Sequence, residues 1–487
     1  MLRSSVLAGM ATVFILSGCS SWGGPADSPD EGAVSAAAAG SKAPDGFSIG
    51  NLFGSSSGPN ETGYAVGDEP YAVRAGADML DQGGSAADAA TTMYFALSAT
   101  YPVAAGLGGG GLCVVYDAAS GRSRAIDFLA RDAAGGGAFA VPGNVRGFAT
   151  LQASFGVLPW SRDVAPGESM AAAGFPISSA LAKRLRASQN VIRLDAGLAA
   201  EFLDEAGQVK AQGTIVASPA LAATLAAIRA RGADALYRGT IAETIVDYAA
   251  EENGAISQSD LAGYRASARE PQILHMGNQR IYLSPRSVGA GNFVMALLSR
   301  LASPDGSATA ADADGATRRA QAAALQEFGV QNLPEDLGAT GFAVRDKNGQ
   351  AVACAVTMNG PFGSGHTARG TGVTLANAPA GQAGLAAAFL TPVVATKDDS
   401  GPLTLPGENA ARAVTLSGAG AGGPNGAATI AYALLRLARG EDMTRPRDLN
   451  KGGVADYDSV NAIVCQNGIC AVLPDSGAHG LGAAAGG

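Results

Sequence analysis

The sequence is poor in histidine and in charge, and both shortages exclude common kinds of site. Only three histidines occur, His275, His366 and His479, and none lies in a nucleophile motif, which disfavours a Ser-His-Asp centre. Charged residues make up 15% of the chain, the formal net charge is −9, and no basic tract occurs, which argues against nucleic-acid binding. No cluster with metal-ligand spacing is present, so we expect neither a metal nor a cofactor.

Cysteine is also scarce, with five residues in the chain. Cys465 and Cys470 flank an Asn-Gly pair, which is a strong signal for a hairpin turn, so an oxidising compartment would let them form a short disulfide. The alternative is that these two cysteines are neighbours by chance. Cys113 and Cys354 lie inside apolar, strand-like runs, and we expect them to be buried thiols.

The N-terminus has the features of a bacterial lipoprotein leader. A basic start precedes an apolar run from Val6 to Leu16, which is too short to span a bilayer. The run ends in Leu-Ser-Gly-Cys, which resembles a lipobox, so we predict a signal peptide over residues 1–18 and a lipid on Cys19. A plain signal peptide with a chance cysteine is the alternative. Ser20 favours the outer membrane, so we expect a lipid-anchored envelope protein facing the periplasm.

The chain after the leader divides by composition. Residues 19–60 are rich in Gly, Ser, Pro and Ala without a helical or strand period, which predicts a flexible tether. The rest, roughly 425 residues, is apolar enough for one large domain or two fused halves.

Buried strands alternate with blocks of apolar helix along this larger part. The glycine run at 106–111 precedes a strand rather than a helix, which excludes a dinucleotide-binding turn. We predict sheets covered by helices on their outer faces. The predicted strands are Leu112–Tyr116, Arg124–Leu129, Arg280–Leu283, Gly341–Arg345, Ala351–Met358 and Ala413–Ser417. The predicted helices include Ala72–Leu80, one from Gly83 through Ala90, one starting in Val141–Gly147, several between 178 and 252, and Ala427–Arg439.

One threonine is the strongest sign of chemistry. Thr340 follows a small Gly-Ala step and opens an alternating strand, as a self-cleaving N-terminal nucleophile requires. Cleavage between Ala339 and Thr340 would leave a free α-amine beside the hydroxyl. An α-amine has a reference pKa of about 7.7–8.0, so it can act as general base without histidine. The competing interpretation is an ordinary structural threonine at a strand start.

Seven segments occur in the order found in γ-glutamyltransferases, and the chain resembles a divergent member of that family from about residue 63 to 439. These segments are Gly83–Ala90, Gly106–Leu112, Val141–Gly147, Phe155–Pro159, Tyr237–Gly239, Asp260–Tyr264 and Phe362–Gly365. The resemblance implies an αββα sandwich of the Ntn-hydrolase type. It also implies a precursor that cuts itself before a threonine, giving a large-subunit-like part, 61–339, and a small-subunit-like part, 340–487, which stay associated.

The resemblance also assigns site residues. The threonine that supports the nucleophile falls on Thr357, and a substrate-contacting asparagine falls on Asn359. The two glycines whose N–H groups form the oxyanion hole fall on Gly422 and Gly423, and backbone donors of this kind are fixed before charge develops. A merely flexible glycine loop is the alternative there.

Several positions depart from the family pattern. The usual nucleophile position holds Ala339, so Thr340 serves only through a one-residue shift, or the chain is inactive. The arginine that binds the substrate carboxylate is displaced to Arg131, two residues later, which within a strand keeps the same face. The aspartate for the substrate amine is missing between Ala376 and Ala380, and Ala388-Phe389 replaces a serine pair.

These observations predict a hydrolase or transferase that acts on γ-glutamyl or related amides through a Thr340 ester. Glutathione is expected to be a poor substrate, since charge-assisted contacts carry much of zwitterion recognition. Two alternatives remain. One is a non-catalytic envelope lipoprotein that keeps the fold, and the other is an acylase for non-glutamyl amides.

Overall fold

The structure is a computed structural model that describes residues 62–285, 289–301, 310–327, 329–397, 413–444 and 457–486. The predicted signal peptide, the lipidation residue Cys19 and nearly all of the tether lie outside these described residues. In the segments that are described, no helix is both long and apolar enough to cross a bilayer.

The first sheet has seven strands, all paired antiparallel, in the order β19-β1-β11-β12-β2-β3-β8. Their bounds are β1 Tyr64–Gly67, β2 Gly110–Asp117, β3 Arg122–Phe128, β8 Ser267–Arg269, β11 Ala339–Arg345, β12 Ala351–Thr357 and β19 Leu481–Ala484. Strands β11 and β12 are buried along their whole length. This agrees with the apolar run of β12, whereas β11 also buries two polar residues, Thr340 and Arg345.

The second sheet has six antiparallel strands in the order β18-β17-β16-β15-β10-β9. Their bounds are β9 Gln272–Met276, β10 Gln279–Leu283, β15 Thr391–Lys397, β16 Val414–Ala421, β17 Ser459–Gln466 and β18 Ile469–Leu473. The two sheets pack face to face through small and aliphatic side chains. Ala343 of β11 and Val394 of β15, for example, belong to one buried cluster.

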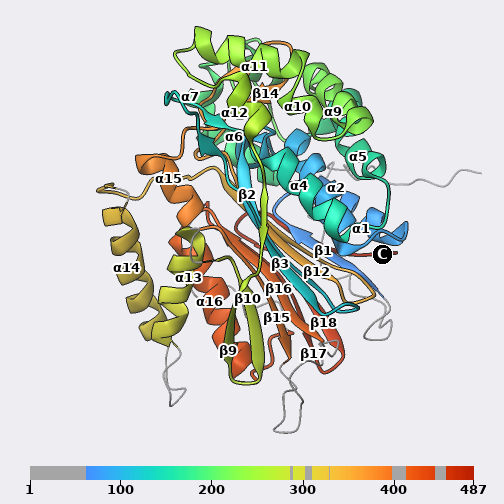
Figure 1. Cartoon of the computed structure of the whole chain (residues 1–487), viewed down its shortest axis with the longest axis vertical. Helices are drawn as coiled ribbons and strands as arrows, with labels where there is room; N and C mark the ends of the chain where they lie inside the picture. Colours follow the sequence, from blue (N-terminus) through green and yellow to red (C-terminus); the bar gives the residue numbers. More distant parts are fainter. Residues whose placement is uncertain are drawn as a thin grey trace, which may run out of the picture. The chain divides into compact units, whose positions relative to one another are not determined.

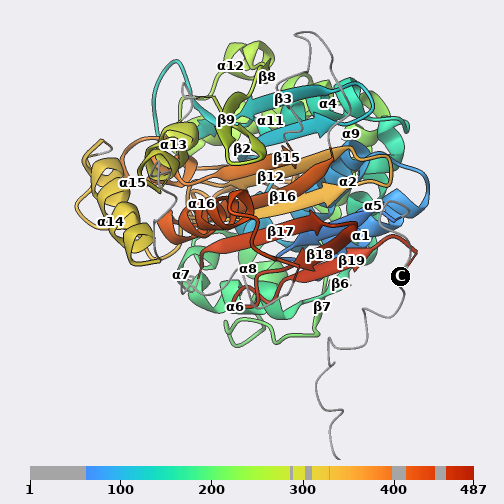
Figure 2. The ribbon, with the colours of Figure 1, turned by 90° about the horizontal axis from the view of Figure 1, so that it is seen from below.

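Helices cover the outer face of each sheet (Figure 1). On the first sheet lie α1 Pro70–Asp81, α2 Ala86–Thr100, α3 Pro102–Ala105 and α4 Asn144–Phe155. On the second lie α13 Gly289–Leu301 and α16 Pro424–Ala438, and α14 Ala310–Glu327 and α15 Gly381–Ala388 pack against these helices. The predicted αββα sandwich is confirmed. The view in Figure 2 shows the strands of both sheets between these helices.

Further helices and three short ladders extend the layer on the first sheet. The helices are α5 Trp160–Ala173, α6 Ser179–Ala187, α7 Gln189–Ile192, α8 Ala196–Phe202, α9 Pro219–Arg231, α10 Asp234–Tyr237, α11 Thr240–Glu251 and α12 Gln258–Gly263. The ladders are β4 Arg131–Asp132 with β5 Ala140–Val141, β6 Phe175–Pro176 with β7 Ile215–Val216, and β13 Thr367–Ala368 with β14 Val373–Thr374.

Helix α2 lies in the centre of the first helical layer, and a capping box fixes where it begins. Ser85 caps the helix, and Asp88 completes a capping box by accepting hydrogen bonds from the N–H and hydroxyl of Ser85. All fifteen helical residues are buried, so small side chains dominate where the helix meets its neighbours. The sequence prediction began this helix at Gly83, but the cap delays its start to Ala86.

The cysteines give one confirmation and one correction. Cys465 and Cys470 are directly opposed in the β17–β18 hairpin and form the predicted disulfide. Cys113 and Cys354 are not free thiols, because they too form a disulfide. They are buried cross-strand partners on β2 and β12, which brings together residues 241 positions apart. The apolar runs predicted burial correctly but carried no sign of this pairing.

Candidate active site

The start of strand β11 places Ala339 and Thr340 on opposite faces of the first sheet, because successive side chains alternate along a strand. The Ala339 methyl packs between the two sheets, in a cluster with Ala419 and Ala421 of β16. The Thr340 side chain points the other way and meets the segment between β1 and α1. The strand opens at Ala339 rather than at Thr340, so the predicted strand start moves by one residue.

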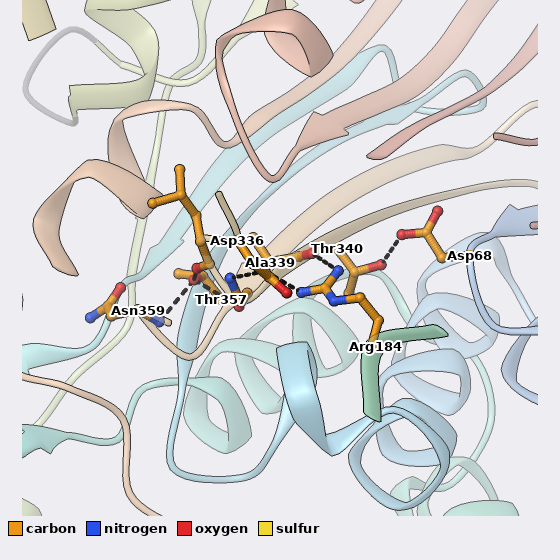
Figure 3. Close-up of polar contacts among 9 residues, drawn as sticks. Asp68, Arg184, Asp336, Ala339, Thr340, Thr357 and Asn359 are labelled. Atoms are coloured by element: carbon orange, nitrogen blue, oxygen red, sulfur yellow. Dashed lines mark hydrogen bonds and ion pairs between the residues drawn. The ribbon is translucent and has the colours of Figure 1, made fainter. Parts of the chain in front are cut away.

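The hydroxyl of Thr340 is held by a buried carboxylate. Its Oγ1 donates to Oδ2 of Asp68 over 2.7 Å, and both residues are 1% exposed. The other carboxylate oxygen accepts a 2.7 Å hydrogen bond from Nδ2 of Asn461 on β17. Burial raises the pKa of Asp68, although its hydrogen bonds from Thr340 and Asn461 oppose the shift. Figure 3 shows the Thr340 hydroxyl directed at Asp68.

A buried ion pair lies beside the residues that precede Thr340. Nη2 of Arg184, on α6, is 2.6 Å from Oδ1 of Asp336, and these side chains are 4% and 9% exposed. Nη1 of Arg184 lies 3.5 Å from the carbonyl oxygen of Ala339. The same Asp336 oxygen also accepts from the N–H of Gly338 over 2.7 Å. Arg184 is therefore fixed to the segment that leads into β11 (Figure 3).

Gly338 is required by the turn into the strand. Its φ is +60°, a left-handed conformation that residues with a side chain rarely adopt, and a Cβ there would collide with the backbone of Gly360. The Gly-Ala step noted in the sequence thus has a structural cause, independent of any chemistry.

Thr357 and Asn359 lie beside the residues before Thr340. Thr357 is the ladder partner of Ala339, and its Oγ1 donates to the carbonyls of Leu337 and Gly338 at 3.2 and 3.0 Å. The N–H of Asn359 donates to the same Oγ1 over 2.9 Å. The Thr357 hydroxyl thus contacts the chain on the Ala339 side, and no hydrogen bond between the two threonine hydroxyls occurs in this part of the described structure.

The side chain of Asn359 pairs with a residue that the sequence analysis did not single out. Its Nδ2 donates to the carbonyl of Asn377 over 2.9 Å, and Nδ2 of Asn377 donates back to the carbonyl of Asn359 over 3.0 Å. Asn377 lies in the stretch where the amine-binding aspartate was expected. This amide pair links the two segments without introducing charge.

Gly422 and Gly423 connect the end of β16 to α16. Gly422 has φ +84°, and the pair directly follows Ala421, which packs against Ala339. The two glycines therefore belong to the face of β11 that carries Ala339, opposite the Thr340 hydroxyl. The carboxylate of Asp458 lies against Gly423, which places a negative group beside the predicted oxyanion hole.

Arg131 does not occupy the position that the strand argument predicted. Strand β3 ends at Phe128, and Arg131 begins the separate strand β4, paired with Val141 of β5. The assumption that Arg131 shares a strand face with Asp127-Phe128 is therefore wrong. Its exposed guanidinium stacks over the ring of Tyr264, 5.0 Å from the ring centre.

A cavity of about 640 Å³ opens elsewhere, among the helices of the first layer. Its polar lining includes Asp195, Glu201, Tyr248, Glu252, His366 and Arg369. None of the predicted site residues lines it. Over the residues that the structure describes, no group of three or more His, Cys, Asp or Glu is arranged to hold a metal ion.

Comparisons with known proteins agree with the fold and the motifs. The sequence profile described as Gamma-glutamyltranspeptidase matches residues 72–326 and 294–382. The chain is 30% identical over 254 residues to a glutathione hydrolase proenzyme of Bacillus subtilis (strain 168), covering 48% of this chain and 43% of that protein. It is 34% identical over 236 residues to the acylase ACY 1 proenzyme of Pseudomonas sp. (strain SE83), covering 43% and 42%.

The structural comparison extends further along the chain. The cephalosporin acylase from Bacillus halodurans superposes with a TM-score of 0.68 at 17% identity, covering 87% of this chain and 96% of that one, which establishes the shared fold. The chain spans less than half the length of the two sequence relatives named above. The profile match covers more than half of this chain, in the segments that carry the quoted motifs, and the chain belongs to the gamma-glutamyltranspeptidase family.

Proposed function

We propose that the protein is a self-cleaving amide hydrolase or acyltransferase in which Thr340 becomes the N-terminal nucleophile. The observation that carries this proposal is the 2.7 Å hydrogen bond from Thr340 Oγ1 to the buried carboxylate of Asp68, directly after the turn at Gly338. The Thr340 hydroxyl and Asn461 are partners of a carboxylate that is buried beside the first peptide bond of β11. Burying such a group is costly unless it is well paired.

Turnover would follow cleavage. The freed α-amine of Thr340 takes the proton of its own hydroxyl, Oγ1 attacks the substrate amide, and the amine leaves to give a threonine ester. Cleavage also frees the start of β11 from the preceding turn, which allows Thr340 to turn towards Gly422 and Gly423. In this proposal these glycines hold the oxyanion, Thr357 orients the nucleophile, and Arg131 and Asn359 contact the substrate.

The first test compares the wild-type chain with Thr340→Ala. We expect the wild type to give a C-terminal fragment that begins at Thr340 and the variant to stay as one chain. Because the disulfide joins Cys113 before the cut to Cys354 after it, the gel must be run under reducing conditions. A fragment that begins at another residue, or a cut variant, would contradict the assignment of Thr340.

The substrate class is read from the same cleaved protein. Hydrolysis of a γ-glutamyl anilide is compared with hydrolysis of an anilide whose acyl group lacks the α-amine and the α-carboxylate. We expect weak γ-glutamyl activity, because Arg131 is engaged with Tyr264 and Asn377 replaces a charged partner near Asn359. Higher activity on the second anilide supports an acylase for non-glutamyl amides.

A second candidate is a non-catalytic protein that keeps the family fold. It is favoured by the Ala339 methyl, which stands opposite Thr357 where the resemblance places the nucleophile, and by Asp458 beside Gly423. This candidate predicts one uncut wild-type chain under reducing conditions. The gel described above therefore separates the two functions.

We also propose that the mature chain is a lipid-anchored envelope protein facing the periplasm. A lipid on Cys19 supplies many buried CH₂ groups, each worth about 0.8 kcal/mol in the bilayer. Cys19→Ser is expected to move the protein from the membrane fraction to the soluble fraction after cell lysis. Membrane retention of that variant would show that another segment binds the membrane.

A further inference from the structure

The two residues that the Ala339–Thr340 peptide bond joins are each contacted by a buried charged group. Asp68 accepts the hydrogen bond of the Thr340 hydroxyl, and Arg184 reaches the carbonyl oxygen of Ala339. Both charged residues come from the part of the chain before the bond, from the segment after β1 and from α6. Neither occurs in the motifs from which the family was inferred.

Asp68 is held in the position of a proton acceptor. Asn461 Nδ2 donates to Oδ1 and to the carbonyl of Gly341, which fixes the carboxylate relative to β11. The remaining oxygen, Oδ2, is the one that faces the Thr340 hydroxyl at 2.7 Å. A general base must lie within about 2.6–3.2 Å of the proton it removes, and this distance meets that requirement.

Arg184 is held in the position of a carbonyl donor. Its Nη2 is occupied by Asp336, and its guanidinium also lies over the rings of Tyr101 and Tyr457, 5.7 and 5.5 Å from their centres. These contacts leave Nη1 as the group beside the Ala339 oxygen. A fixed positive charge at a carbonyl oxygen stabilises the negative charge that develops there when the carbon is attacked.

We propose that Asp68 is the general base and Arg184 the oxyanion donor for cleavage of the Ala339–Thr340 bond. This inference rests on the proposed self-cleavage and adds the groups that perform it. It concerns maturation only, since turnover uses the α-amine that cleavage releases.

Asp68 Oδ2 takes the Thr340 hydroxyl proton while Oγ1 bonds to the carbonyl carbon of Ala339, and the carbonyl oxygen becomes negative beside Arg184. The bond from that carbon to the Thr340 nitrogen then breaks, and the nitrogen receives the proton back from Asp68. The product is an ester between Ala339 and Thr340 Oγ1 with a free amine. Water hydrolyses the ester to the Ala339 carboxylate and the Thr340 hydroxyl.

The test follows cleavage of newly synthesised full-length chains over time on reducing gels. Asp68→Asn keeps the size of the side chain and its capacity to accept a hydrogen bond but cannot take a proton. We expect cleavage to slow at least about a hundredfold, as loss of a general base commonly does. Glu69→Gln is the matched control, because Glu69 is an adjacent buried carboxylate that caps α1 and does not contact Thr340. It should be cut at the wild-type rate.

Arg184→Lys provides a second, independent variant. A single ammonium group can still pair with Asp336 but cannot reach the Ala339 carbonyl at the same time, so cleavage should slow at least about tenfold. Thermal unfolding of each uncut variant checks that it is folded. If Asp68→Asn does not fold, Arg184→Lys still tests whether the buried charged groups promote cleavage.

Each outcome has a defined meaning. The inference is supported if the wild type is cut, Asp68→Asn is cut slowly, and Glu69→Gln is cut at the wild-type rate. Cut wild type with Asp68→Asn or Arg184→Lys cut at the wild-type rate overturns that residue's role and leaves the proposed function intact. Equal slowing in Glu69→Gln would show a general structural effect and overturn the role of Asp68. An uncut wild type overturns both proposals.

Discussion

Asp163→Asn is expected to raise the free energy of unfolding at pH 7 by roughly 2–4 kcal/mol. Asp163 lies in the first turn of α5, is 0% exposed, and neither carboxylate oxygen has a hydrogen-bond partner among the described residues. Burial, with a smaller contribution from the charge of Asp88, raises the pKa of Asp163 to about 9. The folded protein therefore holds this carboxyl neutral at pH 7, whereas the unfolded chain ionises it freely.

The sign of the pH dependence follows from this difference. Between the ordinary value near 3.8 and about 9 the folded state binds one proton more than the unfolded state, so Asp163 makes stability fall as pH rises through that range. Asparagine removes the ionisation. The gain should therefore be absent near pH 4 and largest near pH 9, which urea unfolding at several pH values would measure.

Asp260→Asn is a control that should change the free energy of unfolding in the opposite direction. Partial burial of Asp260 opposes its ionisation, but hydrogen bonds from Ser257 in the α12 capping box and from Ala134 outweigh it and lower the pKa. Replacing this carboxylate should reduce stability at pH 7. Stabilisation by both substitutions would indicate an effect of net charge and contradict the local explanation for Asp163.

In the uncut Thr340→Ala chain, where no cut separates the two cysteines, removal of the Cys113–Cys354 disulfide by replacing both cysteines with alanine is expected to lower the free energy of unfolding by about 5 kcal/mol in the chain-entropy description. The bond closes a loop of 241 residues, so it restricts the unfolded chain strongly. Both cysteines are 0% exposed, so a reductant should reach the bond only in unfolded molecules. Urea unfolding of the oxidised Thr340→Ala chain, with and without the two cysteine replacements, measures the difference.

The second disulfide gives the contrast. Cys465 and Cys470 are five positions apart, and the same description gives about 2 kcal/mol for their loss, so the two double variants should differ by about 3 kcal/mol. Equal losses would mean that loop closure does not determine the stabilisation. They would point instead to packing around each bond.

The sequence predicted the layers because their signals are local. Apolar runs marked β2 and β12 as strands, and an alternating pattern marked β11. Helical spacing marked α1 and α16 within a few residues of their bounds. The Asn-Gly turn predicted the β17–β18 hairpin and its disulfide. Helix and strand ends moved where a cap decided them, as Ser85 does for α2.

The contacts around Thr340 could not be predicted, because they join segments that are distant in the sequence. Asp68 and Thr340 are 272 positions apart, and Arg184 and Asp336 are 152 apart. Each residue is unremarkable in its own segment, and no spacing links them. The Cys113–Cys354 bond escaped prediction for the same reason, since only the pairing of β2 with β12 makes the two cysteines neighbours.

The prediction for Arg131 failed for a different reason. The alternation of side chains along a strand was applied to a residue that lies beyond the end of that strand. A shift of two residues keeps a side chain on the same face only within a strand, and β3 ends at Phe128. Gly338 likewise has a conformational reason to be glycine, so its presence before Thr340 does not by itself indicate cleavage.

The strand order of the first sheet determines whether the two fragments would stay together after a cut at Thr340. Strand β1 comes from the part of the chain before the cut, yet it lies between β11 and β19, which both come after it. Even with the Cys113–Cys354 disulfide reduced, separation of the two fragments would therefore require the hydrogen bonds on both edges of β1 to break together. Size-exclusion chromatography would give the same elution volume before and after processing, so maturation would double the number of chains without changing the hydrodynamic size.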